Sequence, residues 1–583
     1  MPIALAVLVA GAASAHASPP HSPFPPEVNG AVDLLPRPCA LEGTDRYERE
    51  FYEREGWSGP DYERYPGDCQ RLRFSYGPIA VKPGQNDVLV EPVKIEKPMR
   101  DGFITRFEPN LVLPDGSVPP IERVHLHHGT WVSVPDYGSG PFFAAGEEKT
   151  IAPFPKGYGM PVKATDQWLL LYMVHSAVQE PMTVYITYDI DFVPQADAEE
   201  LGLKPAFPVW LDVRPSGYPV FNAQRDYGKK GECTWPKEEC AGFDPYGKQI
   251  VGQGEPGNRK GEDLVLPAAG ESFGRAGPFT GGTLIGIGGH LHPGGLQNEI
   301  DLVRGGKAKR IYTGKAAYWK RRRPGKPGGP PTSWDFSMRV NGNPYWGVHV
   351  KPGDALRSNV TYDTKIQSTY ENMGIAVALF APNDANGRPT APGVDPFKAP
   401  VDHSTRCRSE GLLAKKPTLC DEGGIVTHGH LAENDNFGGP GGEWTATTGP
   451  PTDEVAIADF LYAPGDLTTI EMTGVPTVKL GSTLDFTNFD GAAIYHTVTS
   501  CAFPCLGETG TSFPLSDGAT STGRRVDFDS SELGVGPPAI GPAKQELRWG
   551  MPITGEEGFK PGEVVTYFCR IHPSMRGAFE VTE

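Results

Sequence analysis

The chain has 583 residues and a formal net charge of −17, and it is rich in glycine and proline, with 73 and 60 residues respectively. This length exceeds what one hydrophobic core supports and predicts about three or four domains. The negative charge disfavours a nucleic-acid partner, and after the N-terminus no run of about 18 apolar residues could form a membrane span. Frequent glycine and proline disfavour long helices, so we expect an all-β fold of short strands and turns.

The N-terminus predicts export. Residues 1–17 hold a short apolar run that ends in an A-x-A pattern, as in a secretory signal peptide cleaved after Ala15 or Ala17. The protein is therefore expected to be secreted, periplasmic or otherwise extracytoplasmic. Eight of the nine cysteines are sequence neighbours that could form disulfides in such a compartment: Cys39/Cys69, Cys233/Cys240, Cys407/Cys420 and Cys501/Cys505. Cys569 is left over, and metal ligation would give it a role.

Two β-rich blocks follow an extended N-terminal segment, residues 18–70, which lacks periodicity. The first block covers 71–200, and the second covers 201–382 with a Gly- and Pro-rich insertion at 214–265. Both are expected to be β-sandwiches, because runs of Val, Ile, Tyr and Trp alternate with turn residues. In the first block these runs predict strands at 87–93, 123–134, 167–174 and 183–193.

The first block contains four histidines in expected strands. The phrase RVHLHHGTWV carries His125, His127 and His128, and LLLYMVHSAV carries His175. Alternation along a strand puts His125 and His127 on one face and His128 on the other. His127 and His128 can therefore share one metal only if the strand has a local bulge or twist.

The second block also carries histidines on an expected strand, together with a methionine that could supply a thioether ligand. IGIGGHLHPGG places His290 and His292 on one strand face, and Met373 enters a later strand. A His-x-His pair with a Met from another strand suits copper, because imidazole and thioether both bind Cu(I). A structural role or a zinc site is an equal alternative for any one such pair.

A Gly- and Pro-rich linker is expected at 383–453. It carries one more His-x-His pair, His428 and His430, in VTHGHLAENDNFGG. We expect a structural or solvated role for this pair, with an extra metal site as the alternative.

The C-terminal residues 454–583 carry the strongest motif. VVTYFCRIHPSMRGAFEV predicts a strand that ends at Cys569, followed by His572 and Met575 in a short loop. Upstream, LDFTNFDGAAIYHTVTSC places His496 on another expected strand. One thiolate, two imidazoles and a weak thioether form the ligand set of a blue-copper site, so these four residues are predicted to hold one type 1 copper.

This C-terminal segment resembles the cupredoxins, most nearly the amicyanin and pseudoazurin type, which share the length of the C-x2-H-x2-M loop. The phrase AIADFLYAP is similar to the first strand of that family. The resemblance implies a Greek-key β-sandwich that transfers electrons.

Residues 120–382 resemble the copper type II, ascorbate-dependent monooxygenases, which include the peptidylglycine and dopamine β-monooxygenases. The order of the histidine motifs and the phrase HVKPGDALRSNVTYDT carry the likeness. The stress up-regulated nodulin family shows a similar order. The monooxygenase resemblance implies two jelly-roll-like β-sandwiches and two further coppers, held by His127, His128 and His175 and by His290, His292 and Met373.

Together these features predict an exported multi-copper redox protein, in which the C-terminal domain passes electrons to a monooxygenase-like copper pair. A redox partner protein or a small-molecule reductant would be its partner. Two alternatives remain: a non-catalytic copper-binding protein, either an electron carrier or a copper sequestration protein, and an interaction protein with a vestigial copper site.

Overall fold

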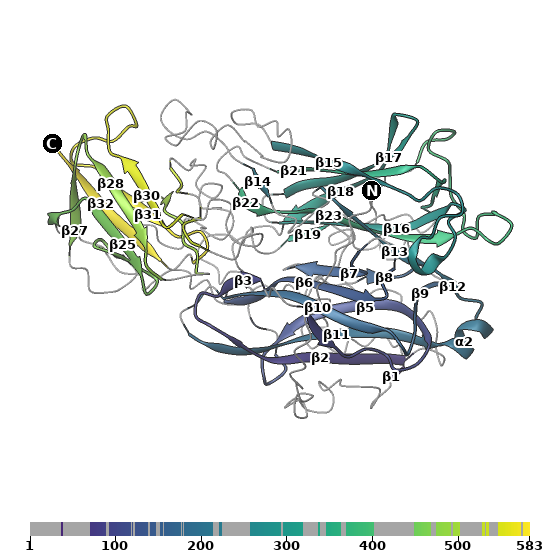
Figure 1. Cartoon of the computed structure of the whole chain (residues 1–583). Coiled ribbons are helices and arrows are strands. Elements are labelled where there is room, and N and C mark those ends of the chain that lie inside the picture. Colours follow the sequence, from purple (N-terminus) through teal and green to yellow (C-terminus); the bar gives the residue numbers. More distant parts are fainter. Residues whose placement is uncertain are drawn as a thin grey trace, which may run out of the picture.

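In a computed structural model of the chain, the regular secondary structure of the described residues is almost entirely β, which confirms the expected all-β fold (Figure 1). The structure describes residues 37–38, 70–213, 221–223, 257–318, 336–338, 346–401, 448–501, 528–535 and 546–583, apart from short gaps inside these ranges. The helical segments in this part of the chain are α2 (Gln195–Glu200) and a 3₁₀ turn at Gly274–Ala276. Among the described residues, none lies in a helix that is long and apolar enough to cross a membrane.

The first sandwich consists of two sheets. One has the order β1-β2-β11-β5-β9-β12, with β8 beside β5, and the other has the order β3-β10-β6-β7, with β4 beside β10. Their strands are β1 Arg37–Pro38, β2 Gln70–Val81, β3 Asn86–Val88, β4 Val93–Ile95, β5 Gly102–Val112, β6 Val124–Val134, β7 Phe143–Gly146, β8 Ala152–Pro153, β9 Tyr158–Val162, β10 Gln167–Ser176, β11 Met182–Pro194 and β12 Lys204–Pro205.

Aromatic side chains fill the space between these two sheets. Phe107 of β5 packs edge-on against Trp131 of β6, with ring centroids 5.2 Å apart, and stacks on Tyr188 of β11 at 5.9 Å. Each such pair contributes about 0.5–1.5 kcal/mol beyond the burial of its area. This rigid core fixes β6 and β10, the two strands that carry the histidines of the first block.

Three of the four strands expected in this block match β6, β10 and β11 closely. The fourth, expected at 87–93, is divided between β3 and β4. Val88 lies opposite Met173 and Val93 opposite Leu170 on the same partner strand. More residues separate the two valines than separate their partners, so one continuous strand could not make both pairings.

The second sandwich packs the sheet β13-β23-β16-β20 against the sheet β15-β21-β17-β18-β19, with β14 and β22 as a separate pair. The strands are β13 Phe207–Asp212, β14 Phe221–Ala223, β15 Gly257–Val265, β16 Gly282–Leu291, β17 Gly295–Arg304, β18 Lys307–Tyr318, β19 Phe336–Met338, β20 Val348–Val350, β21 Ala355–Tyr362, β22 Thr369–Asn372 and β23 Gly374–Pro382.

The expected linker does not begin at residue 383. Val394 forms a bridge to Val348 of β20, and Asp395 accepts hydrogen bonds from Arg304 and Lys351 at 2.8 and 2.9 Å. Residues 384–401 therefore pack on the second sandwich. Their Gly and Pro content reflects turns in a bound segment rather than a spacer between domains.

The C-terminal sandwich has the sheets β24-β27-β32-β31-β29 and β26-β25-β28-β30. It has its own core, which includes Ile457, Phe486, Tyr567 and Phe579. The strands are β24 Thr448–Pro451, β25 Glu454–Ala458, β26 Leu461–Ala463, β27 Val475–Lys479, β28 Thr483–Asn488, β29 Thr499–Cys501, β30 Arg548–Pro552, β31 Val564–Phe568 and β32 Arg576–Thr582.

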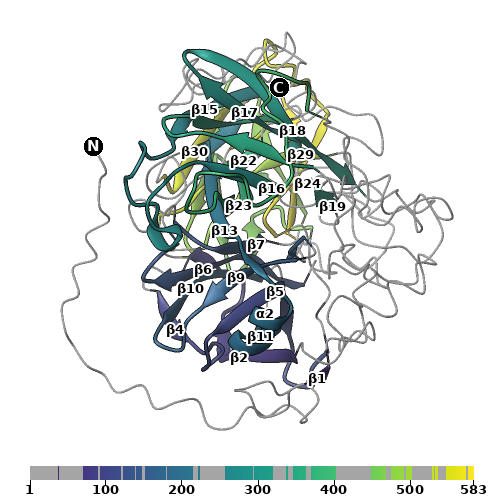
Figure 2. The same cartoon turned by 90° about the vertical axis from the view of Figure 1, so that its right-hand side faces the viewer.

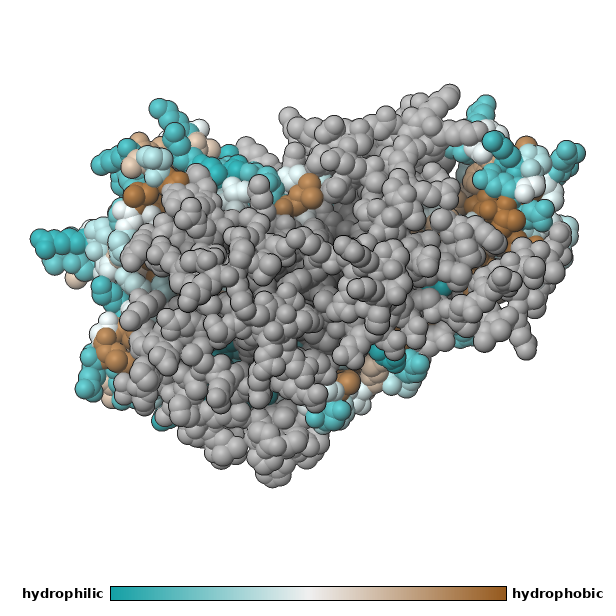
Figure 3. Space-filling model, turned by 180° about the vertical axis from the view of Figure 1, so that it is seen from behind, coloured by the Kyte–Doolittle hydropathy of each residue, from teal (hydrophilic) through white to brown (hydrophobic). Residues whose placement is uncertain are grey.

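The first and second sandwiches lie against each other, with the C-terminal sandwich at one end (Figures 1 and 2). Arg275 of the second sandwich donates to Asp166 of the first at 2.7 Å, and Tyr158 donates its hydroxyl to the Thr390 carbonyl at 3.0 Å. Ile285 also joins the apolar core of the first sandwich. On the face seen in Figure 3, the described residues show a few brown patches, most of them next to hydrophilic residues.

Candidate metal centres

The C-terminal centre is built where β31 ends. Cys569 follows this strand, and the loop returns through two backbone bonds, from the Cys569 N–H to the Met575 carbonyl at 3.1 Å and from the Met575 N–H to the His572 carbonyl at 2.8 Å. His496 comes from the other side of the site. It does not lie on a strand as expected but in an isolated bridge with Leu533, just before β29.

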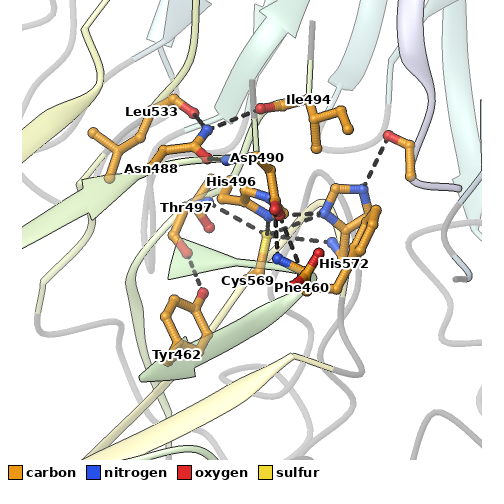
Figure 4. Close-up of polar contacts among 12 residues, drawn as sticks. Phe460, Tyr462, Asn488, Asp490, Ile494, His496, Thr497, Leu533, Cys569 and His572 are labelled. Carbon is orange, nitrogen blue, oxygen red and sulfur yellow. Dashed lines mark hydrogen bonds and ion pairs between the residues drawn. The ribbon is translucent and has the colours of Figure 1, made fainter. Parts of the chain in front are cut away.

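Three donor atoms converge in this centre (Figure 4). Cys569 Sγ lies 3.8 Å from His496 Nδ1 and 3.7 Å from His572 Nδ1, and the two Nδ1 atoms are 3.1 Å apart. All three side chains are fully buried, as is Met575 at the end of the same loop. The separations and the mixed sulfur and nitrogen donors fit one copper ion bound by thiolate and imidazole.

The environment of Cys569 favours the thiolate. The backbone N–H groups of Thr497 and His572 each donate to its sulfur at 3.3 Å. Burial alone would raise the pKa of the Cys569 thiol, but hydrogen bonds and charge interactions with His496 and His572 outweigh burial and hold this pKa well below its ordinary value. The thiolate is the form that binds a metal.

A carboxylate that was not predicted from the sequence orients His496. Asp490 Oδ2 lies 2.8 Å from His496 Nε2, so the opposite ring nitrogen faces Cys569. Asp490 is held in turn by the backbone N–H of Phe460 at 3.2 Å, and its own N–H donates to the Asn488 side chain at 2.9 Å. Such outer carboxylates fix the tautomer and orientation of a ligating histidine.

The first sandwich covers the second ligand ring. His572 Nε2 lies 3.4 Å from the carbonyl oxygen of Gly84, and the His572 ring lies 6.0 Å from the ring of His175 on β10. Gly84 has φ +59°, and a Cβ there would overlap the Phe460 ring. Only glycine therefore allows the turn between β2 and β3 to approach the C-terminal domain this closely.

A β-bulge shapes the histidine strand of the first block. In the β6–β10 pairing, Leu126 lies opposite Val174 and His128 opposite Met173, so His127 is the extra residue. This is the irregularity that the sequence required for His127 and His128 to approach each other. Their rings stack with centroids 4.4 Å apart at 18°.

A second set of donors converges between the two N-terminal sandwiches. His128 Nε2 lies 2.7 Å from His292 Nε2, and ligand nitrogens of His127, His128 and His292 all lie within 4.8 Å of one another. All three residues are buried. Burial, followed by repulsion from neighbouring histidines, holds the pKa values of His127 and His128 well below the ordinary value, so both imidazoles are neutral and able to bind a metal.

This grouping differs from the one expected from the sequence. His175 was grouped with His127 and His128, but its ring packs at 4.8 Å against His125 and at 6.0 Å against His127. Its neighbour toward the C-terminal domain is the copper-ligand candidate His572. The structure thus places His125 and His175 between the two sets of converging donors.

The structure brings together part of the other expected group, which consists of His290, His292 and Met373. The rings of His290 and His292 lie 5.2 Å apart. The Tyr362 hydroxyl accepts the His292 N–H at 2.8 Å and donates to the Met373 carbonyl at 2.7 Å, so Met373 is close to the His292 backbone. His428 and His430 lie outside the described residues.

The structure describes two of the nine cysteines, Cys501 and Cys569. Cys569 is free and buried, and Cys501 is disulfide-bonded. The pairings expected for Cys39/Cys69, Cys233/Cys240 and Cys407/Cys420 fall outside the described residues.

No protein-family model and no curated protein matches the chain. Among solved structures it is similar to a novel purple cupredoxin from Nitrosopumilus maritimus, at 17% identity and TM-score 0.13, over 22% of this chain and 100% of that one. It is also similar to the Cu-containing nitrite reductase (NirK) from Thermus scotoductus SA-01, at 12% identity and TM-score 0.14, over 52% of this chain and 55% of that one.

A third similar structure is the 2F4 variant of the multicopper oxidase McoA from Aquifex aeolicus, at 9% identity and TM-score 0.14, over 79% of this chain and 86% of that one. The two-sheet sandwich and the converging Cys569, His496 and His572 give the described C-terminal residues a cupredoxin-like fold.

Proposed function

We propose that the protein is a copper redox protein whose C-terminal domain exchanges single electrons with a metal centre in the N-terminal sandwiches. The observation that carries the proposal is the burial of His572 against the first sandwich, where it meets the Gly84 carbonyl and the ring of His175. A ligand ring that faces a neighbouring domain favours exchange within the chain.

The residues of the C-terminal site fit one copper ion. Cys569, His496, His572 and Met575 would hold it, and copper in such a site supplies one-electron oxidation and reduction. Asp490 keeps the His496 ring in its binding orientation. Phe460 packs edge-on against both ligand rings, at 5.6 Å from His496 and 4.9 Å from His572, and excludes water from this side of the site.

A row of packed imidazoles supports exchange between the domains. The ring of His175 lies 6.0 Å from His572 and 4.8 Å from His125, and His125 lies 5.8 Å from His127. The row ends at the donors shared by His127, His128 and His292. Aromatic rings in such a series shorten the gaps that an electron crosses between the two centres.

More specifically, the proposed N-terminal centre is monooxygenase-like, and a redox partner or a small-molecule reductant supplies its electrons. Export is part of this proposal, and the disulfide at Cys501 supports an oxidising compartment. The specific observation that favours a non-catalytic electron carrier or copper store is the burial of His127, His128 and His292, because a closed shell of protein ligands suits a structural or storage site.

Optical spectroscopy of the copper-loaded full chain tests the proposal. We expect the intense visible absorption of a thiolate–copper site, which bleaches with a one-electron reductant and returns on reoxidation. Cys569→Ser should abolish the band, whereas Met551→Leu, a change in the core of the same sandwich, should retain it. Copper binding without a reversible band in the unmodified chain would contradict the proposed function.

A further inference from the structure

We infer that His127 and His128 of the first sandwich and His292 of the second form one metal centre shared across the interface, and that this centre takes copper. The inference deepens the proposed function and rests on it, because it names the centre that the C-terminal domain serves. It replaces two separate metal sites, one in each sandwich, with a single site that neither sandwich could complete alone.

The positions of the donor atoms carry the inference. A metal ion binds imidazole nitrogens at about 2.0–2.1 Å, so nitrogens on one ion lie within a few ångströms of each other. The nitrogens of His127, His128 and His292 meet this condition, and the shortest separation, 2.7 Å, joins the two sandwiches. Two buried imidazoles at this distance are brought together by protein packing, and one ion between them would use a lone pair from each.

Hydrogen bonds fix the backbone at the histidines on both sides of the interface. His128 pairs with Met173 of β10 and with Gly146 of β7, so its strand is fixed on both edges. His292 is anchored through its backbone N–H to the Tyr362 hydroxyl and through its carbonyl to the Gly295 N–H at 2.9 Å. These contacts position the two histidines independently of any metal, which lowers the ordering cost of binding.

The donor chemistry selects the ion. Among the described residues, this group contains imidazoles and neither a carboxylate nor a thiolate. Hard cations such as Mg²⁺ and Ca²⁺ prefer oxygen ligands and are disfavoured, whereas imidazole suits the late first-row metals. Copper binds such ligands more tightly than its neighbours in that series.

Copper stoichiometry of the full chain distinguishes one shared centre from two separate ones. A shared centre predicts two copper ions per chain, one of them the blue ion. His128→Gln and His292→Gln should each remove the non-blue ion and its electron paramagnetic resonance signal, and the double variant should lose nothing more. Two separate centres predict three ions, a different ion lost in each single variant, and an additive loss in the double variant.

Matched controls isolate the shared site. His349→Gln changes a half-buried histidine of the same sandwich as His292, whose ring is 3.0 Å from the Thr283 hydroxyl, and it should keep both ions. Met373→Leu discriminates between the two arrangements: a shared centre keeps both ions, whereas a separate site that uses Met373 loses one. His127→Gln provides a third independent substitution, and circular dichroism verifies that each variant folds.

Retention of the non-blue ion in a folded His128→Gln or His292→Gln variant would overturn the shared centre. Failure of the proposed function looks different. In that case the visible band is missing from the unmodified chain, while the non-blue ion still depends on both His128 and His292.

Discussion

At the scale of single residues, Asp490 has the clearest individual effect on the C-terminal site. Its carboxylate fixes the ring of His496 at 2.8 Å. Asp490→Asn should weaken copper binding by about 10–100-fold, because loss of an outer carboxylate reduces the basicity and orientation of the ligand. Competition with a chelator, followed by the visible band, measures the affinity.

Asp485→Asn is the matched control. Asp485 lies on β28, in the same domain, and pairs with the exposed Arg548. A surface pair of this kind contributes little, so the control should bind copper as the unmodified chain does. Equal affinities for both variants would show that Asp490 does not orient the ligand.

The sequence contains a local signal for Asp490. The carboxylate lies six residues before His496 in NFDGAAIYH, and it contacts the ligand ring. The ligands Cys569, His572 and Met575 were easier to find, because one short loop contains all three and local spacing determines their proximity.

At the scale of elements, a buried ion pair supports the ligand loop. Arg570 and Asp529 are almost fully buried, and a guanidinium nitrogen of Arg570 lies 2.6 Å from Asp529 Oδ2. The backbone N–H of Arg570 donates to the Thr497 hydroxyl at 2.8 Å. Asp529→Ala leaves a buried guanidinium uncompensated and should destabilise the C-terminal sandwich by about 3–5 kcal/mol. Chemical denaturation followed by tryptophan fluorescence measures the change.

An ion pair that is more exposed to solvent serves as the control for the Arg570–Asp529 pair. Asp263 and Arg357 join β15 to β21 of the second sandwich, with 30% and 19% of their side chains exposed. Asp263→Ala should cost about 1 kcal/mol or less. If the two substitutions cost the same, the Arg570–Asp529 pair does not support the loop.

The segment 384–401 should make the stability of the second sandwich depend on pH. Burial alone would raise the pKa of Asp395, but hydrogen bonds from Lys351, the Phe397 N–H and Arg304 outweigh burial and lower this pKa from 3.8 to about 2. A carboxyl with a depressed pKa in the folded state stabilises the fold above its unfolded pKa, and this contribution disappears as the pH falls through the folded value.

Asp395→Asn should therefore lower the stability of the second sandwich by about 1 kcal/mol at neutral pH, after allowance for solvent screening. The difference from the unmodified chain should narrow as the pH falls from about 4 towards 2. Denaturation at several pH values tests this expectation, and a difference that does not change with pH would contradict it.

At the scale of the whole molecule, the contact at Gly84 determines how the C-terminal domain sits on the first sandwich. Gly84→Ala would place a methyl group into the Phe460 ring, so it should loosen the interface and increase hydrogen exchange in the turn between β2 and β3. The visible band should persist, because the copper ligands remain in their own domain. The second substitution Phe460→Ala should partly restore the contact.

Gly353→Ala separates this clash from backbone strain. Gly353 also has positive φ, at +76°, but a Cβ there would meet nothing within 4 Å. Backbone strain alone should make this control variant less stable by about 1–2 kcal/mol. Hydrogen exchange at the Gly84 turn should not change. Identical exchange in both variants would mean that Gly84 does not set the interface.

The whole-molecule arrangement also explains what the sequence could not predict. Period-two alternation shows which histidines share a strand face, but His128 and His292 meet only because two sandwiches pack together. The bulge at His127 has no local sequence signal that distinguishes it from a regular strand. The glycine of the turn KPGQ was visible, but its partner Phe460 is distant in the chain.

The contact between Gly84 and His572 also has a consequence for specificity. A small electron carrier that diffuses freely must offer an open ligand edge to any protein that it meets. Here that edge is already occupied by a covalently attached neighbour. Under the proposed function, the fusion therefore replaces choice among diffusing partners with one permanent partner, at the effective concentration that a covalent link sets.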